Sequence, residues 1–344
     1  MRPFEYRSGA DLRDAMRSGA DTGRGEVDAA AQYLAGGTTL IDLMKLDVLR
    51  PRSVVDLRAL KNVMSGIASG RDGLVLGAFV SMAAAAEHPE ILRGYPVIAQ
   101  SLQLAASAQL RNMATLGGNV LQRTRCPFFR DPSFSACNKR TPGSGCQALG
   151  SFNRNHAILG TDESCISQYP GDFAVALIAL DASVEIASPG GNRRLPIAQL
   201  HVGPAGRPHI EHSLRSGEII TGFHVPATPA AARSLYVKVR DRASYEFALA
   251  SCAVALELNG DTVKEVRLGL GGMAYRPWRA KESESLLTGR VLTETSAASA
   301  AAAAFRDVKT HAHNAYKREL GQRTIVRALM EAKAMNPSIM VRPS

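Results

Sequence analysis

Ala35-Gly36-Gly37-Thr38-Thr39-Leu40 and Thr115-Leu116-Gly117-Gly118-Asn119 are the two stretches that decide the fold. Each follows a mixed or apolar run and places a glycine pair beside threonine or asparagine side chains. Backbone without a Cβ atom can approach an anion closely and turn its N–H groups towards it. Two such loops could hold the two phosphates of a dinucleotide. Neither follows G-x-G-x-x-G, so a Rossmann fold is not indicated, and a glycine pair alone is more often a turn or a helix cap.

The composition predicts a globular protein of two or three domains. The chain has 344 residues, of which 45% are hydrophobic and 21% are charged. No apolar run reaches the eighteen or more residues of a membrane span, so no membrane association is expected. The start of the chain lacks the apolar core of an export signal, which favours the cytoplasm, or the periplasm if a partner with a twin-arginine signal carries the folded complex.

The charge of the chain is strongly positive. A net charge of +10 favours an acidic partner or, equally, a solvated basic surface. Aromatic residues make up only 6% of the chain and do not interleave with the basic groups, so nucleic-acid binding is not expected.

The order of helical and strand-like patterns predicts an α+β protein of three units, with bounds of 1–60, 61–228 and 229–344. A proline- and alanine-rich stretch near 226–229 is typical of a linker. Strands are predicted at 32–35, 53–57, 73–80, 184–187, 235–239 and 266–270. Helices are predicted at 12–17, 40–46, 82–87, 96–110, 172–181, 296–305 and 323–332.

Four of the five cysteines, Cys126, Cys137, Cys146 and Cys165, fall within one turn-rich insertion at about 122–168. Their spacing is C-x10-C-x8-C-x18-C, which is no stock zinc or ferredoxin pattern. Four thiolates nevertheless suit a tetrahedral metal ion or a [4Fe-4S] cluster. Two disulfides, or four unrelated buried thiols, are the alternatives. Cys252 lies in an apolar run and is expected to fill the core.

The histidines and serines indicate no hydrolase. The eight histidines form no H-E-x-x-H pairing, and no G-x-S-x-G signature is present. His156 lies within the cysteine insertion, where it could contact a metal or a flavin, although packing is the commoner role for a histidine without a motif.

These residues, in this order, resemble the FAD-binding subunits of molybdenum hydroxylases, the xanthine dehydrogenase family. The resemblance rests on 35–40, on 115–119, on Asp172 at a helix start and on Lys238-Val239-Arg240-Asp241-Arg242-Ala243. It covers nearly the whole chain. The cysteine insertion looks most like that of the periplasmic aldehyde oxidoreductases of enteric bacteria, whose FAD-binding subunit carries an additional [4Fe-4S] cluster.

The resemblance implies a two-subdomain FAD-binding fold, of the PCMH and CO dehydrogenase flavoprotein type, followed by a C-terminal α+β domain. By position, the backbone of the two glycine stretches would bind the FAD pyrophosphate, Asp172 would lie towards the ribityl chain, and Lys238 and the backbone near Ile220 would lie near the flavin ring. The four cysteines would ligate the cluster. The cofactor-binding residues implied are Ala35, Gly36, Gly37, Thr38, Thr39, Leu40, Thr115, Gly117, Gly118, Asn119, Asp172, Ile220 and Lys238.

The function implied is that of an oxidoreductase subunit that transfers electrons. An aldehyde would be oxidised on a large molybdenum-cofactor subunit, and electrons would pass through a small [2Fe-2S] subunit to FAD on this chain and then to an external acceptor. The cofactor carries the redox chemistry, so no catalytic side chain is predicted. A stand-alone flavin oxidoreductase and a zinc-stabilised binding module are the alternatives.

Overall fold

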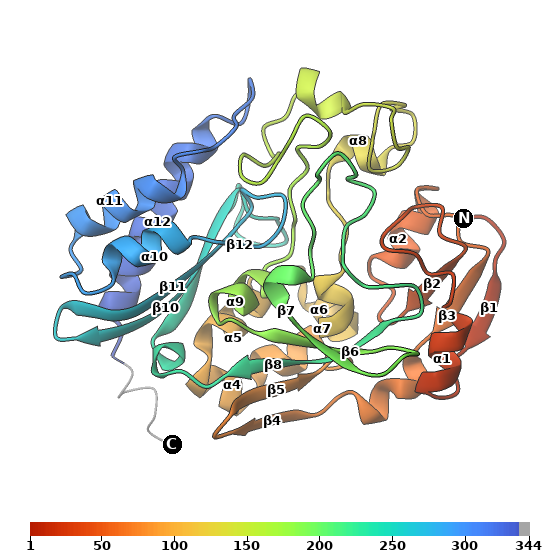
Figure 1. Cartoon of the computed structure of the whole chain (residues 1–344), viewed down its shortest axis with the longest axis horizontal. Helices are drawn as coiled ribbons and strands as arrows, with labels where there is room; N and C mark the ends of the chain where they lie inside the picture. Colours follow the sequence, from red (N-terminus) through yellow and green to blue (C-terminus); the bar gives the residue numbers. More distant parts are fainter. Residues whose placement is uncertain (337–344) are drawn as a thin grey trace.

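Three sheets follow one another along the chain in a computed structural model that describes residues 1–336 (Figure 1). The first is parallel, has the order β1-β3-β2, and carries two short helices. Its elements are β1 (Glu5–Ser8), α1 (Leu12–Ser18), β2 (Ala31–Leu34), α2 (Leu40–Lys45) and β3 (Ser53–Asp56). The strand-to-helix turn between β2 and α2 is the first glycine stretch, so the parallel sheet fixes where that stretch lies.

The middle sheet is antiparallel, with the order β4-β5-β8-β6-β7. Every residue of α9 is buried, and this helix packs in one hydrophobic core with strands of the sheet and with α5. The strands are β4 (Ile67–Gly70), β5 (Gly73–Gly77), β6 (Ser183–Ala187), β7 (Arg193–Pro196) and β8 (Ile219–Pro226). The helices are α3 (Met82–Glu87), α4 (Pro89–Gly94), α5 (Pro96–Gln103), α6 (Ala108–Met113), α7 (Leu116–Val120) and α9 (Phe173–Ala179).

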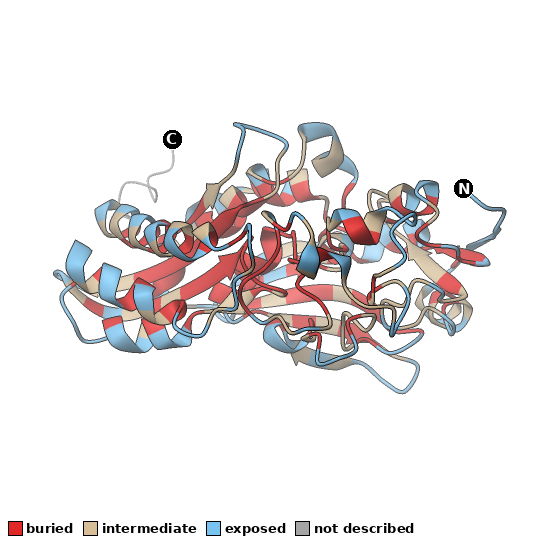
Figure 2. Cartoon of the chain, turned by 90° about the horizontal axis from the view of Figure 1, so that it is seen from above, coloured by how far each residue is buried: buried red, intermediate tan, exposed pale blue. Residues whose placement is uncertain are grey.

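The last sheet, β12-β11-β10-β9, is antiparallel and is covered by three helices that pack through alanine and leucine side chains. Figure 2 shows that buried residues follow the central strands, while these helices turn exposed faces outwards. The elements are β9 (Ser234–Val239), β10 (Ala250–Asn259), β11 (Thr262–Gly271), β12 (Trp278–Arg279), α10 (Lys281–Leu287), α11 (Glu294–Ala304) and α12 (Tyr316–Ala334).

The cysteine insertion is largely irregular, as predicted, with only α8 (Pro127–Arg130) and a 3-10 turn at Gln147–Gly150 between α7 and α9. It lies above the middle unit in Figure 1. Phe129 and Cys137 pack in one apolar cluster with residues of α2, whereas Ile158 and Leu159 belong to the core of the C-terminal unit. The insertion therefore connects the first and last units.

The predicted α+β fold class is confirmed, and three local predictions are wrong. The helix predicted for 96–110 breaks at Ala106, which has a φ of 50°, and resumes after Ser107 caps α6. The second glycine stretch is a short helix, α7, because the Thr115 hydroxyl caps it by accepting from the Gly118 N–H at 3.2 Å. The segment after Pro226 is packed, since Ala230 and Ala231 are buried, and it does not form an exposed linker.

Among residues 1–336, no helix combines the length and the hydropathy that crossing a bilayer requires.

Candidate functional site

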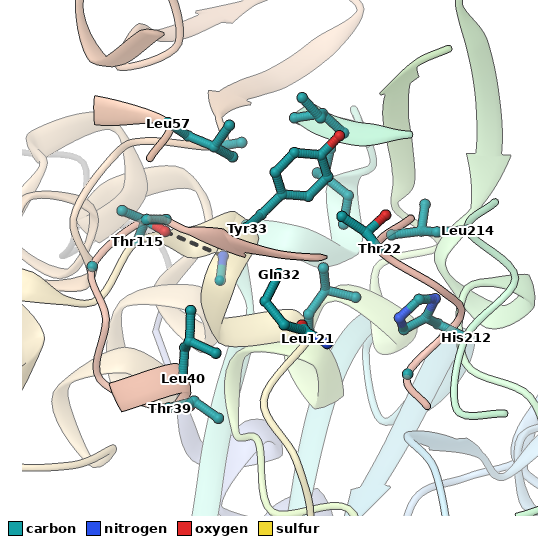
Figure 3. Close-up of a pocket in the computed structure, with 18 of the residues that line it drawn as sticks. Thr22, Gln32, Tyr33, Thr39, Leu40, Leu57, Thr115, Leu121, His212 and Leu214 are labelled. Carbon is teal, nitrogen blue, oxygen red and sulfur yellow. Dashed lines mark hydrogen bonds between the residues drawn. The ribbon is translucent and has the colours of Figure 1, made fainter. Parts of the chain in front are cut away.

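A large cavity lies between the first and middle units, and both glycine stretches line it (Figure 3). Its empty volume is about 1230 Å³, including its open mouth. The far wall comes from the segment that leads into β8. The predicted binding residues that line the cavity are Ala35, Gly36, Gly37, Thr38, Thr39, Leu40, Thr115, Gly117, Gly118 and Ile220.

The glycines let the two stretches approach each other closely. A Cβ atom at Gly36 would lie 2.1 Å from the Met113 carbonyl oxygen, a distance that real Cβ atoms do not show. Gly37 has a φ of 74°, in the left-handed region that favours glycine. A Cβ atom at Gly117 would lie 3.0 Å from the Cβ of Ala78. The glycine pairs thus have a packing role of their own, because a larger residue would displace the wall of the cavity even without a ligand.

The first stretch also offers donors for an anion. Within residues 1–336, the backbone N–H groups of Gly36, Gly37, Thr38 and Thr39 have no hydrogen-bond acceptor. Buried or half-buried amides are normally paired, so adjacent free N–H groups at a cavity wall suit phosphate oxygens.

The second stretch differs, because its amides are used within the chain. The Gly117 N–H donates to the Ala78 carbonyl at 2.9 Å, and the Asn119 N–H donates to the Thr115 carbonyl at 2.8 Å. Asn119 does not line the cavity. Its side-chain Oδ1 is buried without a partner. In the structure this stretch lines the cavity through Thr115, Gly117 and Gly118. A contact between its backbone and a phosphate stays a prediction.

Sequence reasoning missed the polar wall opposite the glycines. Tyr33, Arg123, His212, Arg215 and Glu218 line the cavity, and burial lowers the pKa of His212 to about 4. Burial likewise raises the pKa of the Tyr33 hydroxyl. No motif marks these residues, although Tyr33 lies two residues before the first glycine stretch and could have been found by its position.

Asp172 and Lys238 form a buried ion pair away from the cavity lining. Lys238 Nζ lies 2.7 Å from Asp172 Oδ2, and it also donates to the Leu104 carbonyl at 3.0 Å. The Tyr236 hydroxyl donates to Asp172 Oδ1 at 2.7 Å. Burial raises the pKa of Asp172, and the Lys238 charge opposes that rise. The structure brings these two predicted residues together, and their contact with a flavin stays a prediction.

The four clustered cysteines line one pocket within the insertion, together with Phe128, Lys139 and Ser167. Cys137 and Cys146 face each other in an antiparallel bridge, and the Cys146 thiol hydrogen-bonds Cys165. All five cysteines are free thiols, which does not support the alternative of two disulfides. In the part of the chain that the structure describes, no group of three or more His, Cys, Asp or Glu side chains has the arrangement of a metal-ion site.

The pKa values of these thiols shift in different directions. Burial raises the pKa of Cys126 to about 12, and burial also raises that of Cys137. The hydrogen bond from Cys146 lowers the pKa of Cys165, and the Lys139 charge adds to this effect. His156 Nε2 lies 3.2 Å from Cys126 Sγ, so this histidine contacts a predicted ligand. Cys252 is fully buried in β10, which confirms its predicted place in the core.

The fold and the cavity define a two-subdomain protein with free amides placed for a phosphate-bearing cofactor. Residues 2–228 match the family described as FAD binding domain in molybdopterin dehydrogenase, and residues 235–332 match the CO dehydrogenase flavoprotein C-terminal domain. The chain therefore belongs to the FAD-binding subunits of the molybdenum hydroxylase family, and it is an oxidoreductase subunit that binds FAD. The resemblance inferred from the sequence is confirmed.

Several known proteins are similar over most of the chain. The aldehyde oxidoreductase FAD-binding subunit PaoB of Escherichia coli K12 is 41% identical, over 88% of this chain and 92% of its own length. The glyceraldehyde dehydrogenase medium chain of Sulfolobus acidocaldarius is 25% identical over 85% of this chain and 83% of its own. A carbon monoxide dehydrogenase structure from Hydrogenophaga pseudoflava shares the fold, with a TM-score of 0.74, 24% identity, and coverage of 97% of this chain and 99% of that one.

Proposed function

We propose that this chain is the FAD- and [4Fe-4S]-containing electron-transfer subunit of a heterotrimeric, molybdenum-dependent aldehyde oxidoreductase. The 41% identity to a protein named as an aldehyde oxidoreductase FAD-binding subunit carries the proposal. The partners are a large molybdenum-cofactor subunit, a small [2Fe-2S] subunit and an external electron acceptor. Bound FAD would accept electrons that originate at the molybdenum subunit and deliver them to the acceptor.

The chain's own residues fit a flavin dinucleotide. The free N–H groups of Gly36, Gly37, Thr38 and Thr39 supply donors for phosphate oxygens without a further change of backbone. Arg123 and Arg215 add positive charge to the wall of the same cavity. Burial of the cavity between two units keeps water from much of the cofactor, which strengthens each of these interactions. The chain thus binds and orients FAD, while the redox chemistry belongs to the cofactor.

The cysteine pocket supports the iron-sulfur part of the proposal. Cys126, Cys137, Cys146 and Cys165 come from separate turns of an irregular segment and still face one pocket. A [4Fe-4S] cluster takes one thiolate per iron, so its four ligands surround a body larger than a single ion. Lys139 in the same pocket supplies positive charge against the thiolates.

Metal and flavin analysis of the purified complex tests the proposal. We expect one FAD per chain, four irons in addition to those of the small subunit, and co-purification with two other chains. We also expect the purified complex to oxidise aldehydes when an artificial electron acceptor is supplied. A flavin without extra iron would leave a simple FAD subunit and refute the cluster, and a chain that purifies alone with full activity would establish the stand-alone oxidoreductase.

A further inference from the structure

A small pocket shares lining residues with both the flavin cavity and the cysteine pocket. It shares Leu121 and His212 with the cavity, and both residues are labelled in Figure 3. It shares Lys139 and Ser167 with the cysteine pocket. This pocket therefore adjoins both candidate cofactor sites through residues that it shares with each.

Lys139, Glu211 and Arg276 line this pocket, and Arg123, which lines the flavin cavity, contacts Glu211. One carboxylate oxygen of Glu211 lies 2.6 Å from Lys139 Nζ, and the other contacts Arg123 Nε. Lys139 Nζ also donates to the Tyr275 hydroxyl at 2.9 Å and to the Pro208 carbonyl at 3.1 Å. The side chains of Lys139, Glu211 and Arg123 are only 4%, 17% and 8% exposed. Lys139 lines the cysteine pocket, and Arg123 lines the flavin cavity.

The charges of Glu211 and of Lys139 and Arg123, which both contact it, do not cancel. Two cations and one carboxylate leave one positive charge in a buried position, where an unbalanced charge is costly. The Arg123 and Lys139 charges outweigh the burial that would raise the pKa of Glu211, and hold that pKa below its ordinary value. With both cofactors bound, cluster thiolates at the cysteine pocket and FAD phosphates in the cavity would offset this surplus charge.

Lys139 and Glu211 act on the cysteine pocket in opposite directions. Reduction adds an electron to a thiolate-ligated cluster, so a nearby positive charge favours reduction and a nearby negative charge opposes it. Lys139 is one of the residues that line the cysteine pocket, and Glu211 lies 2.6 Å from its ammonium group. Both effects are strong, because little water screens these side chains.

We propose that Lys139 and Glu211 are positioning residues that set the reduction potential of the cysteine-held cluster relative to the flavin. They do so through opposite charges buried between the two sites. The inference rests on the proposed [4Fe-4S] cluster and adds the side chains that tune it.

Potentiometric titration of the purified holo-complex, followed by electron paramagnetic resonance, tests the inference. We expect Lys139→Met to lower the cluster potential, and Glu211→Gln to raise it, each by at least tenfold in the reduction equilibrium, or 59 mV for one electron. Both variants break the same ion pair, so a merely structural role would move both potentials in the same direction. Lys264→Met, which removes an exposed lysine on β11, is the matched control and should leave the potential unchanged.

Two further measurements keep the test decisive. Lys139→Arg retains the charge and should retain a potential close to that of the wild type, even if Lys139→Met loses its iron. Shifts of equal sign in Lys139→Met and Glu211→Gln, unchanged potentials in both, or a lowered potential in Lys139→Arg would overturn the inference. Absence of extra iron from the wild-type complex would instead overturn the proposed function, and iron content measured beforehand separates the two failures.

Discussion

Replacing Gly36 by alanine tests whether the glycine pair shapes the flavin cavity through chain packing. The added Cβ atom would lie 2.1 Å from the Met113 carbonyl oxygen, 2.9 Å from its carbonyl carbon and 3.1 Å from Ala114 Cα. All three are backbone atoms, so no side chain can rotate away. Restoring even a 3.0 Å contact requires a relative shift of about 0.9 Å, the difference between 3.0 and 2.1 Å, between the first glycine stretch and the residues that directly precede the second.

The cost of such overpacking is about 1–3 kcal/mol. If the shift falls on the cavity wall, FAD binding weakens by roughly 5- to 150-fold, since each 1.4 kcal/mol is a factor of ten. Flavin fluorescence titration of the flavin-depleted complex gives the dissociation constant. Gly94→Ala is the control, because a Cβ atom there, at the end of α4, meets nothing within 4 Å. Equal FAD affinity in Gly36→Ala and Gly94→Ala would refute the reasoning.

Three further predictions concern buried charge and sulfur. Asp172→Asn and Lys238→Met should each destabilise the chain by about 3–5 kcal/mol, and the double variant should recover most of that loss in denaturant unfolding. Burial lowers the pKa of Lys317 to about 7, below its unfolded value, so the unfolded state binds more protons above pH 7. The stability of the wild type should therefore rise by about 2 kcal/mol from pH 7 to 9 relative to Lys317→Met, and parallel pH profiles would contradict this. Cys146→Ser should lose cluster iron while Cys252→Ser keeps it, and equal iron in both would exclude Cys146 as a ligand.

The glycine stretches could be located from the sequence because their requirement is local. Gly37 has a positive φ, and glycine is the residue that adopts such a backbone conformation most readily, so the residue type alone is a local clue. The reason for Gly36 was not visible, because Met113 lies far along the chain and meets it only in the folded state. The helix at Leu116–Val120 was hidden for a related reason: two glycines disfavour a helix, and the Thr115 cap with packing against Ala78 overrides that preference.

The opposite wall of the cavity could not be predicted from any pattern. His212, Arg215 and Glu218 precede β8, and they reach the cavity because β8 pairs between β5 and β6 in the middle sheet. Strand order of this kind depends on contacts between distant segments, which local periodicity does not encode. The sequence likewise could not show that the four cysteines line one pocket. Their spacing matches no motif that fixes a ligand geometry, so their meeting depends on the folded turns between them.

Both candidate sites lie where separate units meet, and this couples cofactor binding to the stability of the whole chain. The flavin cavity draws its walls from the first and middle units, and the cysteine insertion packs against α2 and against the C-terminal core. A ligand that binds only when these units are assembled stabilises the assembly by mass action, by about 2.7 kcal/mol at a concentration one hundred times its dissociation constant. FAD should therefore raise the unfolding temperature of the first and middle units together. If only one of them gained stability, the cavity would belong to that unit alone.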